Sequence, residues 1–270
     1  MKKIIALILS VIMLLSMAAC GTGANTDVSS ETESKAAATT DLDYIKEKGK
    51  MVVGITVYKP MNYEDENGEW TGFDTEFAQL VAKEMGVEAE FTVIDWDSKW
   101  ETLKSKKIDA VWNGMTITPE AQKNATVTQA YVVNAQVIVM NKDRVADYKD
   151  AESVKDLKFA VEAGSAGETI AKDNGYEYTS LTAQSDALTA VKTAKADACI
   201  IDITMANAMT GEGTDYATLA AGISLTEEEY GIACRQGSNL AEEINKIMKD
   251  LKANGKLDDL AKKYELTLAF

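Results

Sequence analysis

Short apolar runs typical of buried strands alternate along the sequence with segments whose apolar residues recur at helical spacing. The alternation stops at a long apolar run, residues 131–140, and then begins again. Helices between short buried strands imply parallel βαβ units with helices on both faces of the sheet. Two such series separated by one long strand predict two α/β lobes. Strands are expected at residues 50–56, 89–94, 108–112, 131–140, 158–161, 176–179, 198–201 and 230–234, and helices at 75–85, 98–105, 185–193, 238–254 and 257–264.

The first nineteen residues predict a secretory signal peptide. Lys2 and Lys3 give a short basic start, and residues 4–17 form an almost unbroken apolar run. A membrane-spanning anchor is the alternative, but the run is shorter than the ~20 residues that a spanning helix needs. Residues 20–41 are then expected to be a flexible tether, because they are rich in small and polar residues and have almost no large apolar side chain to bury.

Charge and composition exclude several classes of function. The chain has 28 Lys and Arg against 43 Asp and Glu, a formal net charge of −15. So acidic a chain repels phosphate backbones, and its basic residues form no cluster, so nucleic-acid binding is not expected. Histidine is absent, which excludes Ser-His-Asp and Cys-His nucleophile systems and a His-based zinc site. We expect neither a metal nor a cofactor.

Two cysteines lie within the expected folded part. Cys199 and Cys234 both stand in apolar runs. Two buried core thiols are therefore favoured over a disulfide bridge between them.

Several motifs follow one another in the order and at the spacing seen in a known family. They are GITVYKP at 54–60, EDENGEWTGFD at 64–74, KIDAVWNGMTITPE at 107–120, DLKFAVEAGS at 156–165, KADACIID at 195–202 and YGIA at 230–233. With these motifs, residues 42–264 resemble the polar amino-acid-binding proteins of ABC importers, family 3 of the bacterial solute-binding proteins.

The resemblance implies both a fold and a function. The fold is the two-lobed periplasmic-binding-protein-like fold of type II, with two α/β lobes joined by two crossing strands. Residues 42–136 and 228–270 would form the first lobe, and residues 137–227 the second. The function implied is that of a monomeric extracytoplasmic protein that captures an amino acid or a related small amine between two closing lobes. It would deliver this ligand to the permease subunits of an ABC importer and would not be an enzyme.

Two other functions remain open on the same fold. One is an exported enzyme of the dehydratase kind, although no pair of carboxylates must converge and the chain lacks His. The other is a ligand-sensing module for a membrane receptor, although no transmembrane or signalling segment follows the second lobe.

The N-terminal region carries a resemblance of its own. Residues 17–21, MAACG, are similar to the lipobox of bacterial lipoproteins, although Met17 stands where Leu is usual. Cys20 would then be lipidated, with palmitate among its acyl chains, and would hold the protein at the extracytoplasmic face of the cell membrane.

The resemblance also implies ligand-binding residues in the first lobe. Family members hold the ligand side chain between two aromatic or apolar residues, and these positions fall on Tyr58 and Trp96. Packing in the core of the lobe is the alternative for both. The turn after the third strand, which offers backbone groups and a hydroxyl to the ligand, maps onto Asn113, Gly114 and Thr116. Gly114 would let the chain approach the ligand closely.

Further positions carry competing interpretations. Asp202 matches the residue that pairs with the α-ammonium of the ligand, or it caps the helix that follows. Asp74 corresponds to a residue that contacts basic side chains in some members, although a helix N-cap is favoured here. Thr116 could cap the helix near residue 119, but Thr118 is better placed. Ser165, in the turn after the fifth expected strand, is a further ligand-binding candidate.

Two usual donors to the ligand carboxylate are missing. Family members carry an Arg after Thr-Pro-Glu that clamps the α-carboxylate with two hydrogen bonds, and this sequence has Ala121. A hydroxyl of the second lobe falls on Ala166. A zwitterionic amino acid should therefore bind poorly, unless Gln122, Lys123 or the backbone of residues 164–167 replaces the Arg. A cationic ligand without an essential carboxylate is favoured, or an amino acid that is held in an atypical way.

Overall fold

The structure, a computed structural model, describes residues 40–270. The predicted signal peptide, the lipidation candidate Cys20 and most of the predicted tether lie outside these residues. The described part begins with helix α1 (Asp41–Lys48), which a capping box between Thr40 and Asp43 starts. The helix thus begins within the stretch 20–41 that the sequence predicts to be a tether, because the cap is a local signal that composition does not reveal.

A sheet of six strands forms the first lobe. Its strands are β1 (Lys50–Ile55), β4 (Glu88–Val93), β5 (Ala110–Thr116), β6 (Ala125–Val127), β7 (Val132–Asn134) and β13 (Glu228–Arg235). The order is β4-β1-β5-β13-β6, and β7 also pairs with β13. Strand β1 runs parallel to β4 and β5, whereas β13 runs antiparallel to its neighbours.

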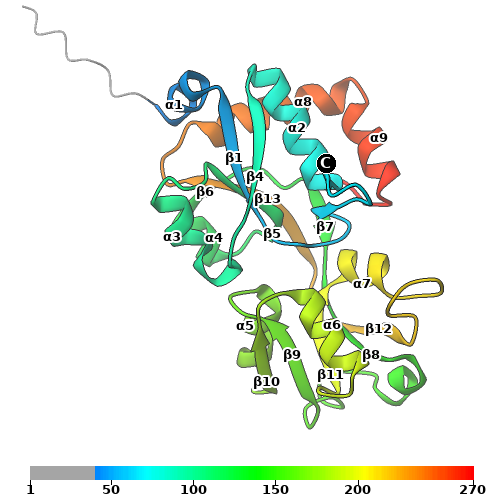
Figure 1. The fold of residues 1–270 in the computed structure, drawn as a ribbon. Helices are drawn as coiled ribbons and strands as arrows, with labels where there is room; N and C mark the ends of the chain where they lie inside the picture. The colour runs from blue at the N-terminus through cyan, green and yellow to red at the C-terminus, as the bar shows by residue number, and fades with distance from the viewer. Residues whose placement is uncertain (1–39) are drawn as a thin grey trace, which may run out of the picture. The chain divides into compact units, whose positions relative to one another are not determined.

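Helices cover both faces of this sheet (Figure 1). Successive residues of β1 point to opposite faces, so Val53 enters one apolar core and Val52 another. The first core lies under α1, α2 (Phe73–Met85), α8 (Leu240–Ala253) and α9 (Lys256–Lys263). The second lies under α3 (Lys99–Lys104) and α4 (Pro119–Asn124). A short hairpin, β2 (Tyr63–Glu64) and β3 (Trp70–Thr71), and a 3-10 turn, η1 (Trp96–Ser98), connect these elements.

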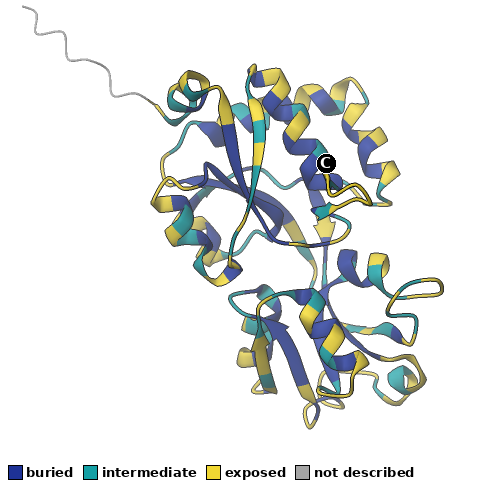
Figure 2. Cartoon of the chain, viewed as in Figure 1, coloured by how far each residue is buried: buried dark blue, intermediate teal, exposed yellow. Residues whose placement is uncertain are grey.

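A second sheet of five strands forms the other lobe. It contains β8 (Gln136–Asn141), β9 (Lys158–Glu162), β10 (Glu177–Leu181), β11 (Ala198–Asp202) and β12 (Leu219–Ser224). The order is β10-β9-β11-β8-β12, with β9 parallel to β10 and β11. Its helices are η2 (Lys142–Asp147), α5 (Ala166–Asp173), α6 (Gln184–Lys192) and α7 (Ile203–Met209). In both lobes the central strands are largely buried and the outer helix faces exposed, whereas the edge strands β4, β10 and β12 are only partly buried (Figure 2).

Two crossings of the chain join the sheets (Figure 1). The run 131–140, predicted as one strand, is two strands, β7 and β8, which belong to different sheets and are separated by Ala135. The chain returns between β12 of the second sheet and β13 of the first. The predicted fold, two α/β lobes joined by two crossing segments, is confirmed.

Several details of the strands differ from the prediction, among them β6, where no strand was expected. Residues 113–116, expected in a polar turn, continue β5 because Met115 and Thr116 pair with Gly231 and Tyr230 of β13. Strand β12 was not predicted, since its sequence LAAGIS has little β-branched or alternating character.

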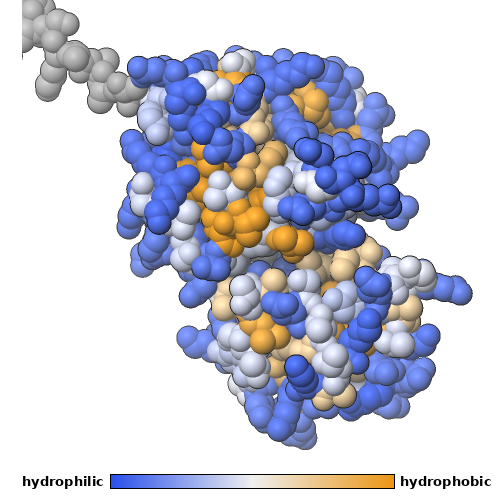
Figure 3. Space-filling model, in the orientation of Figure 1, coloured by the Kyte–Doolittle hydropathy of each residue, from blue (hydrophilic) through white to orange (hydrophobic). Residues whose placement is uncertain are grey.

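The state of the cysteines agrees with the sequence interpretation. Cys199 and Cys234 are buried free thiols in different sheets, as predicted. Hydrophilic residues cover most of the visible surface, and apolar residues gather on the first lobe (Figure 3). No helix within residues 40–270 is long and apolar enough to cross a membrane.

Candidate ligand-binding site

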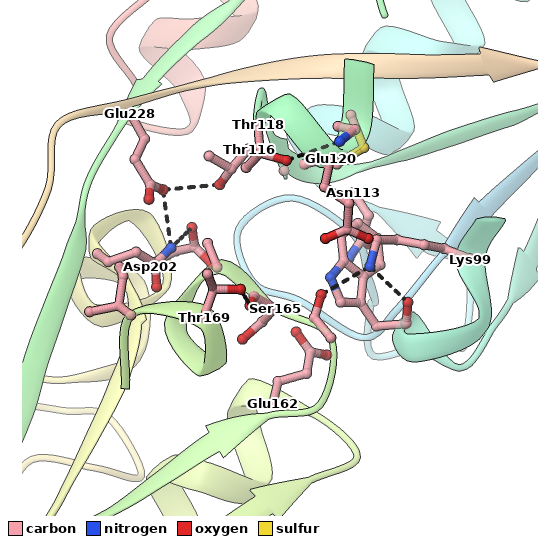
Figure 4. A pocket seen from close by; sticks show the side chains of 18 of the residues that line it. Lys99, Asn113, Thr116, Thr118, Glu120, Glu162, Ser165, Thr169, Asp202 and Glu228 are labelled. Carbon is pink, nitrogen blue, oxygen red and sulfur yellow. Dashed lines mark hydrogen bonds between the residues drawn. The ribbon is translucent and has the colours of Figure 1, made fainter. Parts of the chain in front are cut away.

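A cavity of about 290 Å³ lies between the two lobes, where strands of both sheets end (Figure 4). Glu162 and Asp202 are the last residues of the parallel strands β9 and β11. Both side chains therefore stand at the carboxyl edge of the second sheet, where open α/β sheets bind ligands. The cavity is lined by Trp96, Lys99, Trp100, residues 113–116, residues 118–121, Gln136, Glu162, residues 164–166, Thr169, Ile170, Gln184, Asp202, Thr226 and Glu228.

Most of the predicted ligand-binding residues meet at this cavity. Those that line it are Trp96, Asn113, Gly114, Thr116, Ser165 and Asp202. The structure does not bring Tyr58 and Asp74 to the cavity, and both are buried between other elements.

Tyr58 connects the two lobes. Its ring is only 2% exposed, and its hydroxyl shares hydrogen bonds of 2.5 Å with the hydroxyls of Thr204 and Tyr230. The ring also packs on Gly114, where an added Cβ would approach Tyr58 to 2.7 Å. Gly114 has φ +54°, so this position needs glycine for its backbone as well as for the space that Tyr58 occupies.

The prediction that Asp74 caps a helix is wrong. Gly72 is the N-cap of α2, and no side chain caps that end. The carbonyl oxygens of Pro60 and Met61 instead accept hydrogen bonds from the backbone N–H groups of Phe73 at 2.9 Å and Asp74 at 3.0 Å. The loop before the helix thus satisfies the donors that a cap would have satisfied.

The carboxylate of Asp74 instead holds strand β5 and the crossing segment in place. It accepts hydrogen bonds from the Gly114 N–H at 2.6 Å and from the Tyr131 hydroxyl at 3.0 Å. Burial raises the pKa of Asp74 to about 7. Asp74 therefore supports the wall of the cavity from behind.

Asp202 does not cap a helix through its side chain either, although it occupies the N-cap position of α7. Its Oδ1 accepts hydrogen bonds from Asn134 Nδ2 at 2.5 Å, Gln136 Nε2 at 2.9 Å and the Tyr230 hydroxyl at 2.9 Å. Its Oδ2 accepts one from Gln184 Nε2. Burial, and next the charge of Glu228, raise the pKa of Asp202 to about 7.

Three predicted residues make polar contacts within the protein. Asn113 Nδ2 donates to Thr56 Oγ1 at 2.7 Å. The hydroxyl of Thr116 donates to Glu228 Oε2 at 3.0 Å. The hydroxyl of Ser165 caps α5.

The helix that begins at Pro119 is capped by Thr118. The Thr118 hydroxyl accepts a hydrogen bond from the Ala121 N–H at 3.0 Å. Thr118 rather than Thr116 is therefore the cap, as the sequence favoured.

Lys99 was not predicted as a site residue. Its side chain is almost fully buried, and Nζ donates to the carbonyl oxygens of Gly164 at 2.9 Å and Trp96 at 3.1 Å. The ammonium lies 4.7 Å from the ring centroid of Trp96 and 5.1 Å from that of Trp100. Burial lowers the pKa of Lys99. The spacing Trp-x-x-Lys-Trp at the start of a helix was the available sequence signal.

Glu162 was also missed. It is 3% exposed, and Oε1 has no hydrogen-bond partner within residues 40–270. Burial, and next the charge of Asp202, raise the pKa of Glu162 to about 8, while Lys99 acts in the opposite direction. A charged residue that ends an apolar strand was the signal that could have revealed it.

Comparison with known proteins identifies the family. The model of the bacterial extracellular solute-binding proteins, family 3, matches residues 51–267. The chain belongs to this family. It is 32% identical to the arginine-binding extracellular protein ArtP of Bacillus subtilis, over 98% of both chains. A crystal structure of a mutant of ArgBP from T. maritima is 33% identical, with a TM-score of 0.77 over 83% of this chain and 98% of that one.

A third similar protein is an ancestral amino acid-binding protein, AncCDT-1, described as a precursor of cyclohexadienyl dehydratase. It is 32% identical, with a TM-score of 0.76 over 83% of this chain and 98% of that one.

This family 3 solute-binding protein has no arginine in the wall of its cavity within the part of the chain described. Ala121 occupies the predicted position and is buried at the cavity wall. Gln122 and Lys123, proposed from the sequence as substitutes, are exposed and do not line the cavity. Both side chains lie on the exposed side of α4, whereas the side chain of Lys99 on α3 lines the cavity. Lys99 is therefore the one basic residue among the lining residues of 40–270.

The backbone of the turn 164–167 is partly engaged already. The Gly164 N–H donates to Glu168 Oε2 at 2.8 Å, and the Ser165 N–H donates to the carbonyl oxygen of Glu162 at 3.2 Å. The N–H group of Ala166, which starts α5 and lines the cavity, remains as a donor for a ligand, whereas Gly167 is buried and does not line the cavity.

Proposed function

We propose that this solute-binding protein captures a small cationic solute outside the cell and delivers it to the permease of an ABC importer. The solute class is an amino acid with a basic side chain or a related amine. The observation that carries the proposal is the excess of acidic side chains in the cavity wall, which contains Glu120, Glu162, Asp202 and Glu228 but only one basic side chain among the described residues, Lys99. The names of ArtP and of ArgBP support the same class of ligand.

Electrostatics explains why this wall selects a cation. Carboxylates that are removed from water are stable only when they are protonated or paired with positive charge. A cationic solute supplies that charge inside the cavity. An anionic solute would add a further negative charge at short range, where interactions are weakly screened. Glutamate and aspartate should therefore be rejected.

A carboxylate on the solute can be accepted but is not required. Lys99 Nζ and the Ala166 N–H at the start of α5 are donors at the cavity that a carboxylate can use. The positive end of the helix dipole favours an anion there. These groups replace the missing arginine only in part, because none offers the paired, planar donors of a guanidinium. The solute is thus selected mainly by its positive charge.

The binding movement is closure of the two lobes about the crossing segments. Hydrogen bonds from Tyr58 to Thr204 and from Lys99 to Gly164 already link the lobes on two sides. A solute that contacts both walls would stabilise this arrangement, and the permease would recognise it.

Thermal unfolding of the purified full-length chain tests the proposal. Arginine, lysine, ornithine, agmatine and putrescine would be compared with glutamate, glutamine and aspartate. Ligand binding to the folded state adds RT ln(1 + [L]/Kd), roughly 4 kcal/mol at a thousandfold excess over Kd. We expect at least one cationic solute to raise the Tm, and we expect glutamate and aspartate to leave it unchanged. A shift with the acidic amino acids alone would refute the proposal.

Binding without chemical conversion is part of the proposal, and a dehydratase is the alternative. The alternative has one specific basis, because Glu162 is a buried carboxylic acid in the cavity and AncCDT-1 is described as a dehydratase precursor. Against it, the acidic wall would repel a substrate whose net charge is negative. A cationic solute recovered unchanged after prolonged incubation with the protein, as shown by mass spectrometry, would support binding alone.

Attachment to the membrane through Cys20 is also proposed, on the similarity of residues 17–21 to a lipobox. The lipid would hold the protein beside its permease at the extracytoplasmic face. Replacing Cys20→Ser should move the protein from the membrane fraction into the medium and abolish incorporation of labelled palmitate. Retention of the variant in the membrane would contradict the lipid anchor.

A further inference from the structure

The four carboxylates of the cavity wall differ in how fully their oxygens are engaged. Oxygens of Asp202 accept four hydrogen bonds from protein donors. Glu228 Oε2 accepts three, from Thr116, Asn134 and Gln136. Together these groups tie β11 of the second lobe to β7 and β13 of the first, so Asp202 and Glu228 serve the junction between the lobes.

The other two carboxylates are not part of this junction. Glu120 Oε1 accepts a hydrogen bond from Trp100 Nε1 at 2.8 Å, and Glu120 is exposed. Glu162 is buried, and its Oε1 has no partner within the described residues. Figure 4 shows the Glu162 side chain directed from the end of β9 into the space below Asn113 and Lys99. Of the four carboxylates, Glu162 is the one that has a buried oxygen without a hydrogen-bond donor among the described residues.

We propose that Glu162, rather than Asp202, pairs directly with the positive charge of the solute. The inference rests on the proposed function, since it assigns the recognising residue within the same cavity. A buried carboxylate oxygen without a partner is costly, and a cationic donor removes that cost by a charge-assisted hydrogen bond. Asp202 already accepts four hydrogen bonds, three at Oδ1 and one at Oδ2, so a cationic donor gains less there than at the unpaired Glu162 oxygen.

The aromatic side chains beside Glu162 suit a cationic donor. Trp96 and Trp100 line the cavity, and both rings already hold the Lys99 ammonium at cation–π distance. An amine or guanidinium can use the same kind of contact. Among the described lining residues, Lys99 is the one basic side chain, so only its ammonium competes with a cationic solute for the two rings.

Proton release should accompany binding at Glu162. The groups that face its carboxyl are Asp202 on β11, Lys99 on α3, and Asp186 and Gln184 on α6. In the empty cavity, burial and these carboxylates favour the protonated acid near neutral pH. A bound cation favours the ionised form, so the solute expels the proton to solvent. No bond other than that O–H bond changes.

A neighbouring carboxylate on α5 does not alter this balance. Glu168 accepts hydrogen bonds from the Gly164 N–H and from the Ser180 hydroxyl. It is therefore engaged outside the cavity wall, on the side toward β10.

The sign of the pH dependence follows. The pKa of Glu162 is about 8. At a lower pH, binding of the cation must displace a proton from Glu162, so affinity rises with pH. The rise should approach about tenfold per pH unit between pH 6 and 7.5 for one released proton. Asp202, with a pKa of about 7, would contribute only if the solute changed its environment.

Calorimetric titration of the full-length chain tests the assignment. Agmatine and L-arginine would be titrated at pH 7 in phosphate and in Tris, because the difference in buffer ionisation heat counts the protons released. Glu162→Gln should weaken the binding of both solutes by roughly tenfold or more and abolish the proton release. Glu212→Gln is the matched control, with the same change at an exposed glutamate outside the cavity wall, and should leave both quantities unchanged.

The outcomes separate this inference from the proposed function. If the wild-type chain binds no cationic solute, the proposed function fails. If the wild-type chain binds one and Glu162→Gln binds it equally well with the same proton release, the function stands and the Glu162 assignment is overturned.

A second variant keeps the assignment testable if Glu162→Gln does not fold. Glu162→Asp keeps the charge but withdraws it from the solute, so it should keep the proton release and bind more weakly. Unchanged affinity in Glu162→Asp would overturn the assignment. Asp202→Asn should loosen the lobe junction and lower the Tm of the empty protein, an effect that Glu162→Gln should not share.

Discussion

The ammonium group of Lys99 donates a hydrogen bond of 2.9 Å to the carbonyl oxygen of Gly164. Lys99 begins α3 of the first lobe, and Gly164 lies in the turn between β9 and α5 of the second. The bond therefore spans the cavity, beside the two tryptophans that flank the ammonium. Lys99 both connects the lobes and sets how much negative charge the cavity presents.

Replacing Lys99→Met should change the preference between solutes with and without a carboxylate. The variant loses the one basic side chain in the wall among residues 40–270, but it keeps an apolar chain between the rings. L-arginine and agmatine differ by the α-carboxylate alone, so the ratio of their affinities isolates this contribution. We expect arginine to weaken about fivefold relative to agmatine, the value of one hydrogen bond.

Calorimetry measures that ratio directly. Lys123→Met is the matched control, because Lys123 is exposed on α4 outside the cavity wall. An unchanged ratio in Lys99→Met would show that Lys99 does not contact the solute carboxylate.

Replacing Ala121→Arg should restore recognition of amino acids by their carboxylate. Ala121 is buried at the cavity wall, so an arginine there can reach the solute, although the added volume costs about 1–3 kcal/mol of stability. Affinity for glutamine should rise by roughly tenfold, while affinity for agmatine should fall through charge repulsion.

Ala121→Met supplies volume without charge and serves as the control. Thermal shift and calorimetry would compare the two variants. If neither glutamine nor any other amino acid gained affinity in Ala121→Arg, the position would not face the solute carboxylate.

Tyr58→Phe and Trp96→Leu should separate stability from binding. The Tyr58 hydroxyl joins Thr204 and Tyr230 but lies outside the cavity, so its removal should cost about 1 kcal/mol of unfolding free energy. Trp96 lines the cavity, and its loss should weaken cation binding by roughly fivefold. Urea unfolding and solute titration of both variants give the two numbers. A larger loss of solute affinity in Tyr58→Phe than in Trp96→Leu would reverse the assignment.

The buried carboxyl of Asp74 should make the protein less stable as pH rises. Its folded-state pKa is about 7, raised by burial above the ordinary 3.8, so the native protein holds a proton that the unfolded chain has lost. The stability from Asp74 is fully present below pH 4 and is lost as pH rises to 7, by about 1.4 kcal/mol per unit. Asp202 and Glu162 act in the same direction.

Urea unfolding between pH 5 and 7 measures this slope. Asp74→Asn should reduce the slope. Asp65→Asn is the control, because backbone hydrogen bonds hold the pKa of Asp65 low and its titration lies below this window. An equal slope in the wild-type chain and in Asp74→Asn would show that Asp74 is ionised in the native state throughout.

The sequence predicted the lobes well because their signals are local. Runs such as residues 50–56 and 198–201 are short, apolar and bounded by turns, and β1 and β11 form there. The division of residues 131–140 between two sheets is not local, since it depends on which partner each half finds. The fold class could therefore be predicted, whereas the extent of β5 and the presence of β12 could not.

The site was predicted less completely for a related reason. The predicted Trp96 and Asp202 line the cavity. Tyr58 instead bonds to hydroxyl groups at the lobe junction, and Asp74 accepts hydrogen bonds within the first lobe. Such partners are up to 172 residues away in sequence. The only sequence signal of Glu162 was a charged residue at the end of an apolar strand, and many solvent-exposed residues carry the same signal.

Titration of the full-length chain with agmatine, L-arginine and L-glutamate at pH 7.5, under one set of conditions, tests the central claim most directly. An acidic cavity without an arginine should bind at least one of the two cationic solutes roughly a hundredfold more tightly than glutamate. Equal or tighter binding of glutamate would show that the carboxylates of the wall do not select the charge of the solute, and would contradict the account.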